Sequence, residues 1–80
     1  MKIKINHPMA DTMSRVNFKG TYSGDGTSEL AFFQNNDWQV IAIPEFCTYH
    51  DGSDSNADTA VYPYVPNELI DAFLDKYKVA

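Results

Sequence analysis

The chain has 80 residues, 44% of them hydrophobic and 14% aromatic, which is enough apolar side chain for one small domain over residues 1–80. Its formal net charge of -5 disfavours direct contact with nucleic acid, because that contact depends on Lys and Arg neutralising phosphates. No apolar run has the roughly 18 to 20 residues of a membrane-spanning helix, and no apolar signal-peptide segment follows the N-terminal lysines. We therefore expect a cytoplasmic protein that does not contact membranes.

The charges are distributed unevenly along the chain. No lysine or arginine lies between Thr21 and Asp75, and this stretch carries ten of the eleven acids. Residues 1–20 carry four bases and one acid, and the last five residues add two more bases. Such an asymmetry bears on partners rather than on fold. It fits either a solvated acidic surface or an acidic face that binds a partner.

The first part of the chain predicts two strands of a sheet. Residues 2–6 alternate between polar and apolar, which is typical of a half-buried strand, and Pro8 ends it because proline donates no ladder hydrogen bond. Residues 9–13 fit either a loop or one helical turn. Residues 14–22 alternate again and predict the second strand. The predicted inward-facing residues of these strands are Ile3, Ile5, Val16, Phe18 and Tyr22.

A turn and a hairpin surround the next two predicted strands. Residues 23–26, Ser-Gly-Asp-Gly, are a strong turn signal, and residues 28–34 predict a strand with alternate apolar residues on one face. The Asn-Asn-Asp run at 35–37 tolerates left-handed backbone geometry and predicts a tight hairpin. Residues 38–43 are nearly continuously apolar, which predicts a central strand covered on both faces.

The last third of the chain predicts a polar loop, an edge strand and a helix. Residues 50–58 are polar, and residues 59–65 predict a short strand whose Pro63 favours the edge of a sheet. A helix follows, with Pro66 in its first turn or Asn67 as its cap. Its apolar stripe consists of Leu69, Ile70, Phe73, Leu74 and Tyr77. The fold class is therefore α+β, with a three- to five-stranded, mostly antiparallel sheet and one C-terminal amphipathic helix packed on one face.

The periodicity also predicts a molecule with two electrostatic sides. Alternate residues of a strand share a face, so the bases of the first two strands are expected to gather on one face of the sheet. These bases are Lys2, Lys4, Arg15 and Lys19. On the helix, Glu68, Asp71 and Asp75 are three and four residues apart, so they form one exposed acidic stripe.

One loop partly matches a calcium-binding motif. Asp54, Asn56 and Asp58 supply oxygens at the alternating positions that open a calcium loop. Thr59 stands where that loop needs its turn glycine, and Val65 stands where it needs a bidentate glutamate. We therefore favour a polar, solvated loop and predict no metal site here.

A lone cysteine and a nearby histidine are the other chemical candidates. Cys47 excludes an internal disulfide, and His50 lies three residues after it. Both residue types serve in nucleophilic catalysis and in zinc sites, but the short spacing lacks the usual geometry of a catalytic pair. We predict that Cys47 is a small buried residue at a strand end, and that the protein is not an enzyme and has no cofactor.

Part of the chain resembles a known hairpin. Residues 16–23 (VNFKGTYS), Leu30, residues 35–37 (NND) and the pair Val40–Ile41 are together similar to the β-hairpin of small acidic anti-CRISPR proteins. Proteins of that family are encoded by phages or prophages, inhibit RNA-guided nucleases and mimic DNA with acidic side chains. The resemblance implies a small acidic inhibitor that occupies a nucleic-acid site in the cytoplasm of a host cell.

The first functional hypothesis is a non-enzymatic inhibitor with a DNA-mimicking surface. Its partner is a basic protein surface such as a nucleic-acid-binding groove, and its binding is expected to weaken steeply with salt. The predicted contact residues are Asp51, Asp54, Asp58, Glu68, Asp71 and Asp75.

The second hypothesis is a small structural or adaptor module that binds protein, or forms a homodimer, through a sheet edge and an aromatic surface. In that case the contacts are Tyr62, Tyr64 and Phe33, and the acids serve solubility.

Overall fold

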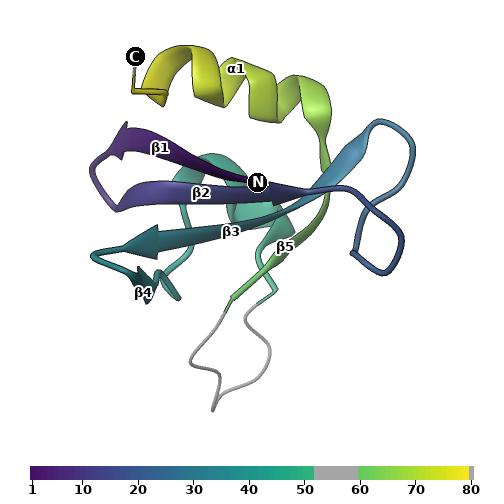
Figure 1. Ribbon diagram of the computed structural model, residues 1–80, viewed down its shortest axis with the longest axis horizontal. Coiled ribbons are helices and arrows are strands. Elements are labelled where there is room, and N and C mark those ends of the chain that lie inside the picture. Colours follow the sequence, from purple (N-terminus) through teal and green to yellow (C-terminus); the bar gives the residue numbers. More distant parts are fainter. Residues whose placement is uncertain (52–59, 80) are drawn as a thin grey trace.

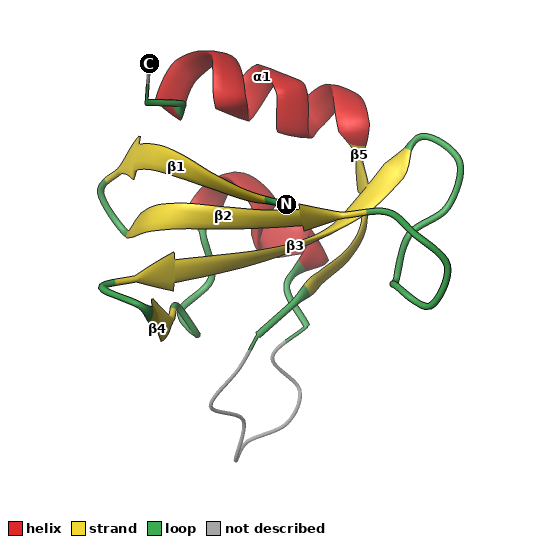
Figure 2. Cartoon of the chain, in the orientation of Figure 1, coloured by secondary structure: helices red, strands yellow, loops and turns green. Residues whose placement is uncertain are grey.

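The computed structural model describes residues 1–51 and 60–79, which form an open antiparallel sheet with a C-terminal helix (Figure 1). The elements are β1 (Lys2–His7), β2 (Ala10–Val16), β3 (Thr27–Gln34), β4 (Asp37–Trp38), the 3-10 helix η1 (Pro44–Tyr49), β5 (Tyr62–Pro66) and α1 (Asn67–Tyr77). The strand order is β1-β2-β3-β4, and β5 pairs with the first half of β3. In Figure 2, α1 runs along β1 and η1 lies behind the strands. The predicted α+β class, with its antiparallel sheet and C-terminal helix, is confirmed.

The register of the first three strands separates an apolar face from a polar one. Ile3 pairs with Met13 and Met13 pairs with Phe32, so these residues share one face of the sheet. The opposite face carries Lys2 and polar residues such as the Ser14 with which it pairs. Because side chains alternate along each strand, this register buries one face and leaves the other to solvent.

The second strand lies earlier in the chain than the alternation suggests. β2 covers Ala10–Val16, so residues 9–13 are neither a loop nor a helical turn but mostly strand. The predicted strand over 14–22 is wrong beyond Val16, and Phe18 and Tyr22 are exposed rather than core residues. Gly20 has a φ of 97°, a left-handed conformation that turns the chain away from the sheet.

The hairpin after β3 has the predicted tight turn. Asn35 and Asn36 have φ values of 54° and 68°, and Gln34 pairs with Asp37 across them. Two central residues with positive φ define the type I′ turn that suits the twist of a hairpin. Asp11 supports this turn, because its carboxylate accepts the Asn35 N–H at 2.9 Å.

The predicted central strand over residues 38–43 is wrong. β4 ends at Trp38, and Val40 and Ile41 are exposed. The chain then turns inward at Ile43, which is fully buried, and η1 begins at Pro44. The stretch of the described sheet that is buried on both faces lies in β3, where Leu30, Ala31 and Phe32 are consecutive buried residues.

The end of the chain confirms an edge strand and an amphipathic helix. β5 pairs with β3 alone among the named strands, so Pro63 occupies the edge position that it favours. α1 buries Ile70 and Phe73, whereas Leu69 is 42% exposed and does not belong to the buried stripe. Asn67 is not a cap of this helix, because its side chain bonds to the sheet instead.

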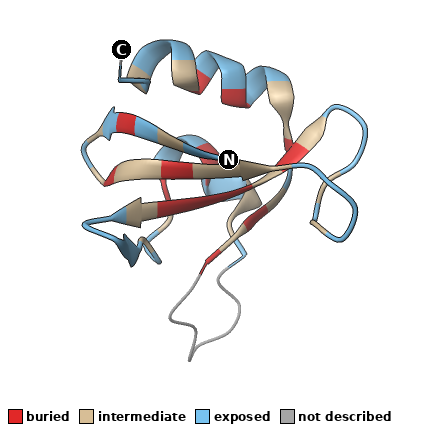
Figure 3. Cartoon of the chain, in the orientation of Figure 1, coloured by how far each residue is buried: buried red, intermediate tan, exposed pale blue. Residues whose placement is uncertain are grey.

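A cluster of aromatic rings joins the sheet to both helices. The Phe32 ring lies 6.0 Å from Phe46 of η1, 5.3 Å from Tyr62 of β5 and 5.9 Å from Phe73 of α1. Figure 3 shows the buried residues concentrated on β2, β3, β5 and the inner side of α1. This single cluster fixes where α1 and η1 stand relative to each other.

Candidate functional site

The candidate site is the solvent face of α1 together with the hollow between α1 and η1. Glu68, Asp71 and Asp75 are all exposed on the helix, on the side away from the buried Ile70 and Phe73. The three acids predicted to form a stripe therefore do share a face. Their spacing of three and four residues corresponds to about 4.5 and about 6 Å along the axis, from roughly 1.5 Å per residue.

The middle acid of the stripe is paired with a base. Arg15 Nη1 donates to Asp71 Oδ1 at 3.0 Å, and Arg15 Nη2 donates to Asn67 Oδ1 at 3.2 Å. Asp71 keeps 65% of its side chain exposed, so it remains accessible from solvent. Arg15 reduces the negative charge at the centre of the stripe, since it stands between the sheet and the helix.

The same contact corrects the predicted basic face of the sheet. Arg15 has the same parity along β2 as the buried Met13, so it points to the side covered by α1. Lys2 and Lys4 lie on the opposite face, where they pair with Ser14 and Thr12. Lys19 lies beyond the end of β2, in an exposed loop. The bases are therefore divided between the two sides of the sheet.

Asp51, the remaining predicted contact that the structure describes, does not join the helix. Asp51 donates its backbone N–H to the Val61 carbonyl just before β5, whereas α1 begins after that strand ends. Five residues of β5, roughly 16 Å of extended chain, separate the two places. Asp54 and Asp58, and the calcium-loop hypothesis with them, lie outside the described residues.

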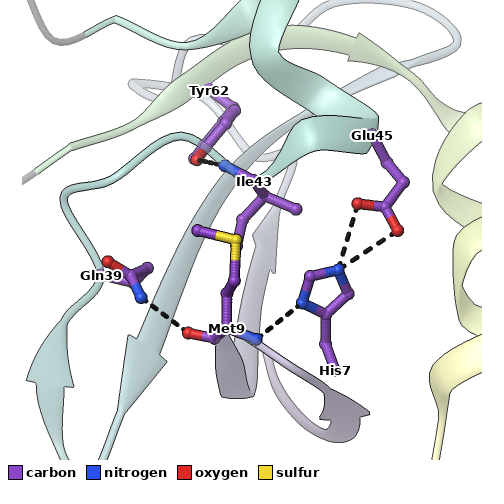
Figure 4. Close-up of polar contacts among 6 residues, drawn as sticks. All are labelled: His7, Met9, Gln39, Ile43, Glu45 and Tyr62. Atoms are coloured by element: carbon purple, nitrogen blue, oxygen red, sulfur yellow. Dashed lines mark hydrogen bonds and ion pairs between the residues drawn. The ribbon is translucent and has the colours of Figure 1, made fainter.

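A buried histidine ties η1 to the start of the sheet (Figure 4). The Met9 backbone N–H donates to His7 Nδ1 at 3.0 Å, which makes Nδ1 the acceptor and leaves the ring proton on Nε2. His7 Nε2 then donates to both carboxylate oxygens of Glu45, at 3.1 and 3.2 Å. Only 4% of the His7 side chain is exposed, and the rings of Phe73 and Tyr77 lie against it. Both ring nitrogens have hydrogen-bond partners, so neither is free to accept a proton from a substrate. The side chain instead connects the end of β1 to η1.

Glu45 stays ionised in this setting although it is partly buried. Burial raises its pKa, but its own backbone N–H, the Tyr77 hydroxyl and the His7 ring together hold the pKa below the ordinary value of a glutamate. The His7 ring of β1 donates to both oxygens of this carboxylate. The carboxylate is a fixed negative charge at the border between the two helices.

Beside this carboxylate, α1 and η1 line an open hollow of about 250 Å³. Its apolar lining includes the buried rings of Phe46 and Phe73 and the exposed side chains of Leu69 and Ala72. Its polar lining consists of Glu45, Lys76 and Tyr77. Lys76 lies 5.1 Å from the centre of the Tyr77 ring, so its ammonium group is held over that wall.

The cysteine and histidine candidates do not form a reactive pair. Cys47 is exposed on η1 and is not the buried strand-end residue that we predicted. His50 donates its backbone N–H to the Cys47 carbonyl, while its ring Nε2 lies 3.1 Å from the Val40 carbonyl and its ring contacts Tyr62. In residues 1–51 and 60–79, no three His, Cys, Asp or Glu side chains gather as metal ligands.

Sequence reasoning missed the wall of this hollow. His7 and Glu45 are 38 residues apart, and neither belongs to a motif whose spacing predicts their contact. Leu69 was assigned to the core because it fits the helical periodicity. One signal in the sequence does predict this side of the helix. Leu69, Ala72 and Lys76 are three and four residues apart, so they lie together on one flank of α1.

No family model matches the chain, and no curated protein or solved structure shows significant similarity to it. The similarity of the hairpin to anti-CRISPR proteins therefore stays a prediction. Among the described residues, no helix has both the length and the apolar character that a membrane span requires.

Proposed function

We propose that the protein is a non-enzymatic inhibitor of the anti-CRISPR type, which binds a basic, nucleic-acid-processing partner through the acidic face of α1. The observation that supports the proposal is the shared, solvent-facing position of Glu68, Asp71 and Asp75 on one helix that the core holds in place. Carboxylates fixed on a rigid element attract a positively charged groove and compete there with phosphates.

The spacing of the carboxylates on the helix determines how strongly the acidic face can attract a basic groove. The three carboxylates are about 4.5 and about 6 Å apart along the axis, whereas one DNA strand carries a phosphate every 3.4 Å, roughly. Arg15 further reduces the charge at Asp71. The acidic face alone is therefore a weaker ligand than DNA, and an effective inhibitor needs additional contacts.

The proposal is tested with purified RNA-guided nucleases as probes. We expect the protein to slow cleavage of target DNA, and the inhibition to weaken when salt is raised from about 50 to about 200 mM. The double variant Glu68→Gln, Asp75→Asn should lose most of the inhibition, since it removes two exposed charges without touching the core.

A matched control removes two acids elsewhere. Glu29 lies on the face of β3 opposite to the buried Leu30 and Phe32, and Asp37 is exposed at the start of β4, so neither acid faces α1. The double variant Glu29→Gln, Asp37→Asn has the same net charge as the helix variant and should inhibit like the parent protein. Equal loss in both variants, or inhibition that salt leaves unchanged, would contradict a specific role of the α1 face.

A second candidate function is self-association through the β4 edge. Trp38, Val40 and Ile41 are 37%, 42% and 65% exposed along this edge, which gives three apolar side chains in four residues. The edge of β1 is a poorer candidate, because the Val79 N–H donates to the Lys4 carbonyl and covers part of it.

The aromatic residues of this second hypothesis need one correction. Tyr62 is fully buried, and its hydroxyl accepts the Ile43 N–H, so it is not a surface contact. Tyr64 is exposed and Phe33 is half-buried. Sedimentation velocity over a wide concentration range tests the candidate: a dimer that Ile41→Lys dissociates supports it, and a monomer at the highest concentration contradicts it.

A further inference from the structure

We propose that the hollow between α1 and η1 is an anchor pocket, which takes one apolar side chain from a basic segment of the partner while the surrounding acids bind the lysines or arginines beside that anchor. This inference rests on the proposed function, because it names the contact by which the acidic helix face gains affinity and specificity. Four features of the hollow support it: its size, its lining, its fixed wall and its charge.

The size of the hollow fits a side chain rather than a small-molecule ligand. Its volume of about 250 Å³ is below the roughly 300 to 1,000 Å³ of pockets that enclose drug-sized molecules. Protein interfaces commonly depend on one or two apolar anchors that fill a pocket of this kind near the centre of the contact.

Part of the apolar lining lies outside the hydrophobic core and is exposed to solvent. Ile70 and Phe73 face the sheet and are buried, whereas Leu69 is 42% exposed and Ala72 is also exposed. These two residues occupy the flank of α1 that faces η1, over a floor formed by the buried Phe46 and Phe73. An apolar anchor placed there removes the exposed part of Leu69 from water, which is a favourable transfer.

The wall of the hollow is held in place before any partner binds. Glu45 and Tyr77 both line it, and the Tyr77 ring packs against the rings of His7 and Phe73. His7 donates to the Glu45 carboxylate and is itself fixed by the Met9 N–H. A wall fixed by hydrogen bonds loses little conformational entropy on binding, so it acts as a preorganised surface.

The charge around the hollow favours a basic partner. Glu68 and Asp75 lie four residues before and three residues after Ala72, so both flank the opening on the helix surface. Glu45 adds a third carboxylate at the wall, against the single ammonium group of Lys76 among the lining residues that the structure describes. An anchor with lysine or arginine on either side therefore meets opposite charge in most directions.

The test uses two synthetic peptides as probes and the whole 80-residue protein. One peptide has six lysines around a central leucine, and the other has serine in place of that leucine. Binding is followed by amide chemical shifts at low ionic strength. We expect the leucine peptide to bind about tenfold more tightly, which is the order of effect of burying one apolar side chain, and to shift the amides of Leu69, Ala72 and Lys76.

Variants separate this inference from the proposed function. Leu69→Ser and Ala72→Gln should abolish the difference between the two peptides, while Ile41→Ser, at an exposed apolar residue outside the hollow, should preserve it. If both peptides bind equally and only Glu68→Gln and Asp75→Asn weaken them, the acidic face binds and the anchor pocket is wrong.

The remaining outcomes are equally decisive. If neither peptide binds, both the anchor pocket and the basic partner are overturned. If the Leu69 and Ala72 amides shift with protein concentration alone, the occupant is a second copy of this chain and the basic-segment proposal is wrong.

Discussion

The Arg15 guanidinium joins the sheet to the helix through Asp71, with 3.0 Å between Nη1 and Oδ1. A second donor of the same group reaches Asn67, so the first two turns of α1 are both tied to one side chain of β2. This is the one position in the described chain where a base and an acid, rather than two apolar side chains, connect α1 to β2. Loss of this ion pair is therefore expected to lower stability and, at the same time, to strengthen binding to a basic partner.

Arg15→Ala is expected to lower stability and to strengthen binding to a basic partner. A partly exposed ion pair contributes about 0.2–1 kcal/mol, and loss of the Asn67 bond adds to this, so we expect a loss of about 1 kcal/mol in urea unfolding. The variant also leaves Asp71 without its counter-charge, so inhibition should rise at low salt. Arg15→Lys keeps the charge and should change binding less. Parallel losses of stability and inhibition would contradict this assignment.

Tyr62→Phe is expected to cost about 1–2 kcal/mol at neutral pH. The Tyr62 hydroxyl accepts the Ile43 N–H at 2.9 Å inside the core, and without it that N–H is buried with no acceptor. Urea unfolding of the two proteins under the same conditions measures the difference. A variant as stable as the parent would show that water replaces the hydroxyl at the Ile43 N–H.

The same tyrosine predicts a loss of stability in alkali. Burial raises the pKa of Tyr62, although the bond from Ile43 opposes the shift. Because the pKa of Tyr62 is higher in the folded protein than in the unfolded chain, its hydroxyl contributes fully to the free energy of unfolding below about pH 10. That contribution is lost as the pH rises through the folded pKa. The stability difference between the parent and Tyr62→Phe should therefore shrink above about pH 10. A difference that stays constant to the highest pH tested would contradict the shift.

The sequence predicts best where one face of an element is buried and the other is wet. β1 and α1 meet this condition, and β3 meets it except at the buried Ala31, so their periodicity located them correctly. The turn at Asn35 and Asn36 was predictable for a different reason, because asparagine tolerates positive φ. Each of these signals is local to the element that carries it.

The errors arise where tertiary contacts override the local pattern. The apolar run 38–43 looks like a central strand, but the fold uses only Ile43 in the core and leaves Val40 and Ile41 exposed. Arg15 alternates like a surface residue, yet α1 supplies partners that draw it to the inner side. The pair His7–Glu45 joins two elements whose proximity depends on the whole sheet, so no spacing along the chain predicts it.

Glu45→Ala is expected to destabilise the protein more than Glu45→Gln. The alanine leaves the buried His7 ring N–H without its acceptor, at a cost of about 1–2 kcal/mol, whereas glutamine still offers one oxygen. Unfolding in urea at pH 7 compares the two variants. Identical losses would show that the charge, and not the acceptor geometry, is what matters.

Acid should remove part of the contribution of Glu45. Its folded pKa lies below the unfolded value of about 4.3, so the contribution is complete above that pH and is lost as the pH falls through the folded value. Asp11 titrates in the same direction, since the Asn35 N–H and the Thr12 hydroxyl lower its pKa. The stability gap between the parent and Glu45→Gln isolates Glu45, and it should close below about pH 4. A gap that widens in acid would contradict this sign.

Asn67→Ala is expected to cost more stability than Ser28→Ala, because it removes two side-chain hydrogen bonds and Ser28→Ala removes one. The Ser28 hydroxyl donates to Asn67 Oδ1 at 2.6 Å, and Ser28 is only 1% exposed. Asn67→Ala therefore leaves a buried hydroxyl without a partner and also takes an acceptor from Arg15, at about 1–3 kcal/mol. Ser28→Ala removes the buried donor itself and leaves Asn67 bonded to Arg15, so its cost should be about 1 kcal/mol. In the double variant the losses should be less than additive, which a double-mutant cycle in urea measures. Strict additivity would show that the two side chains do not depend on each other.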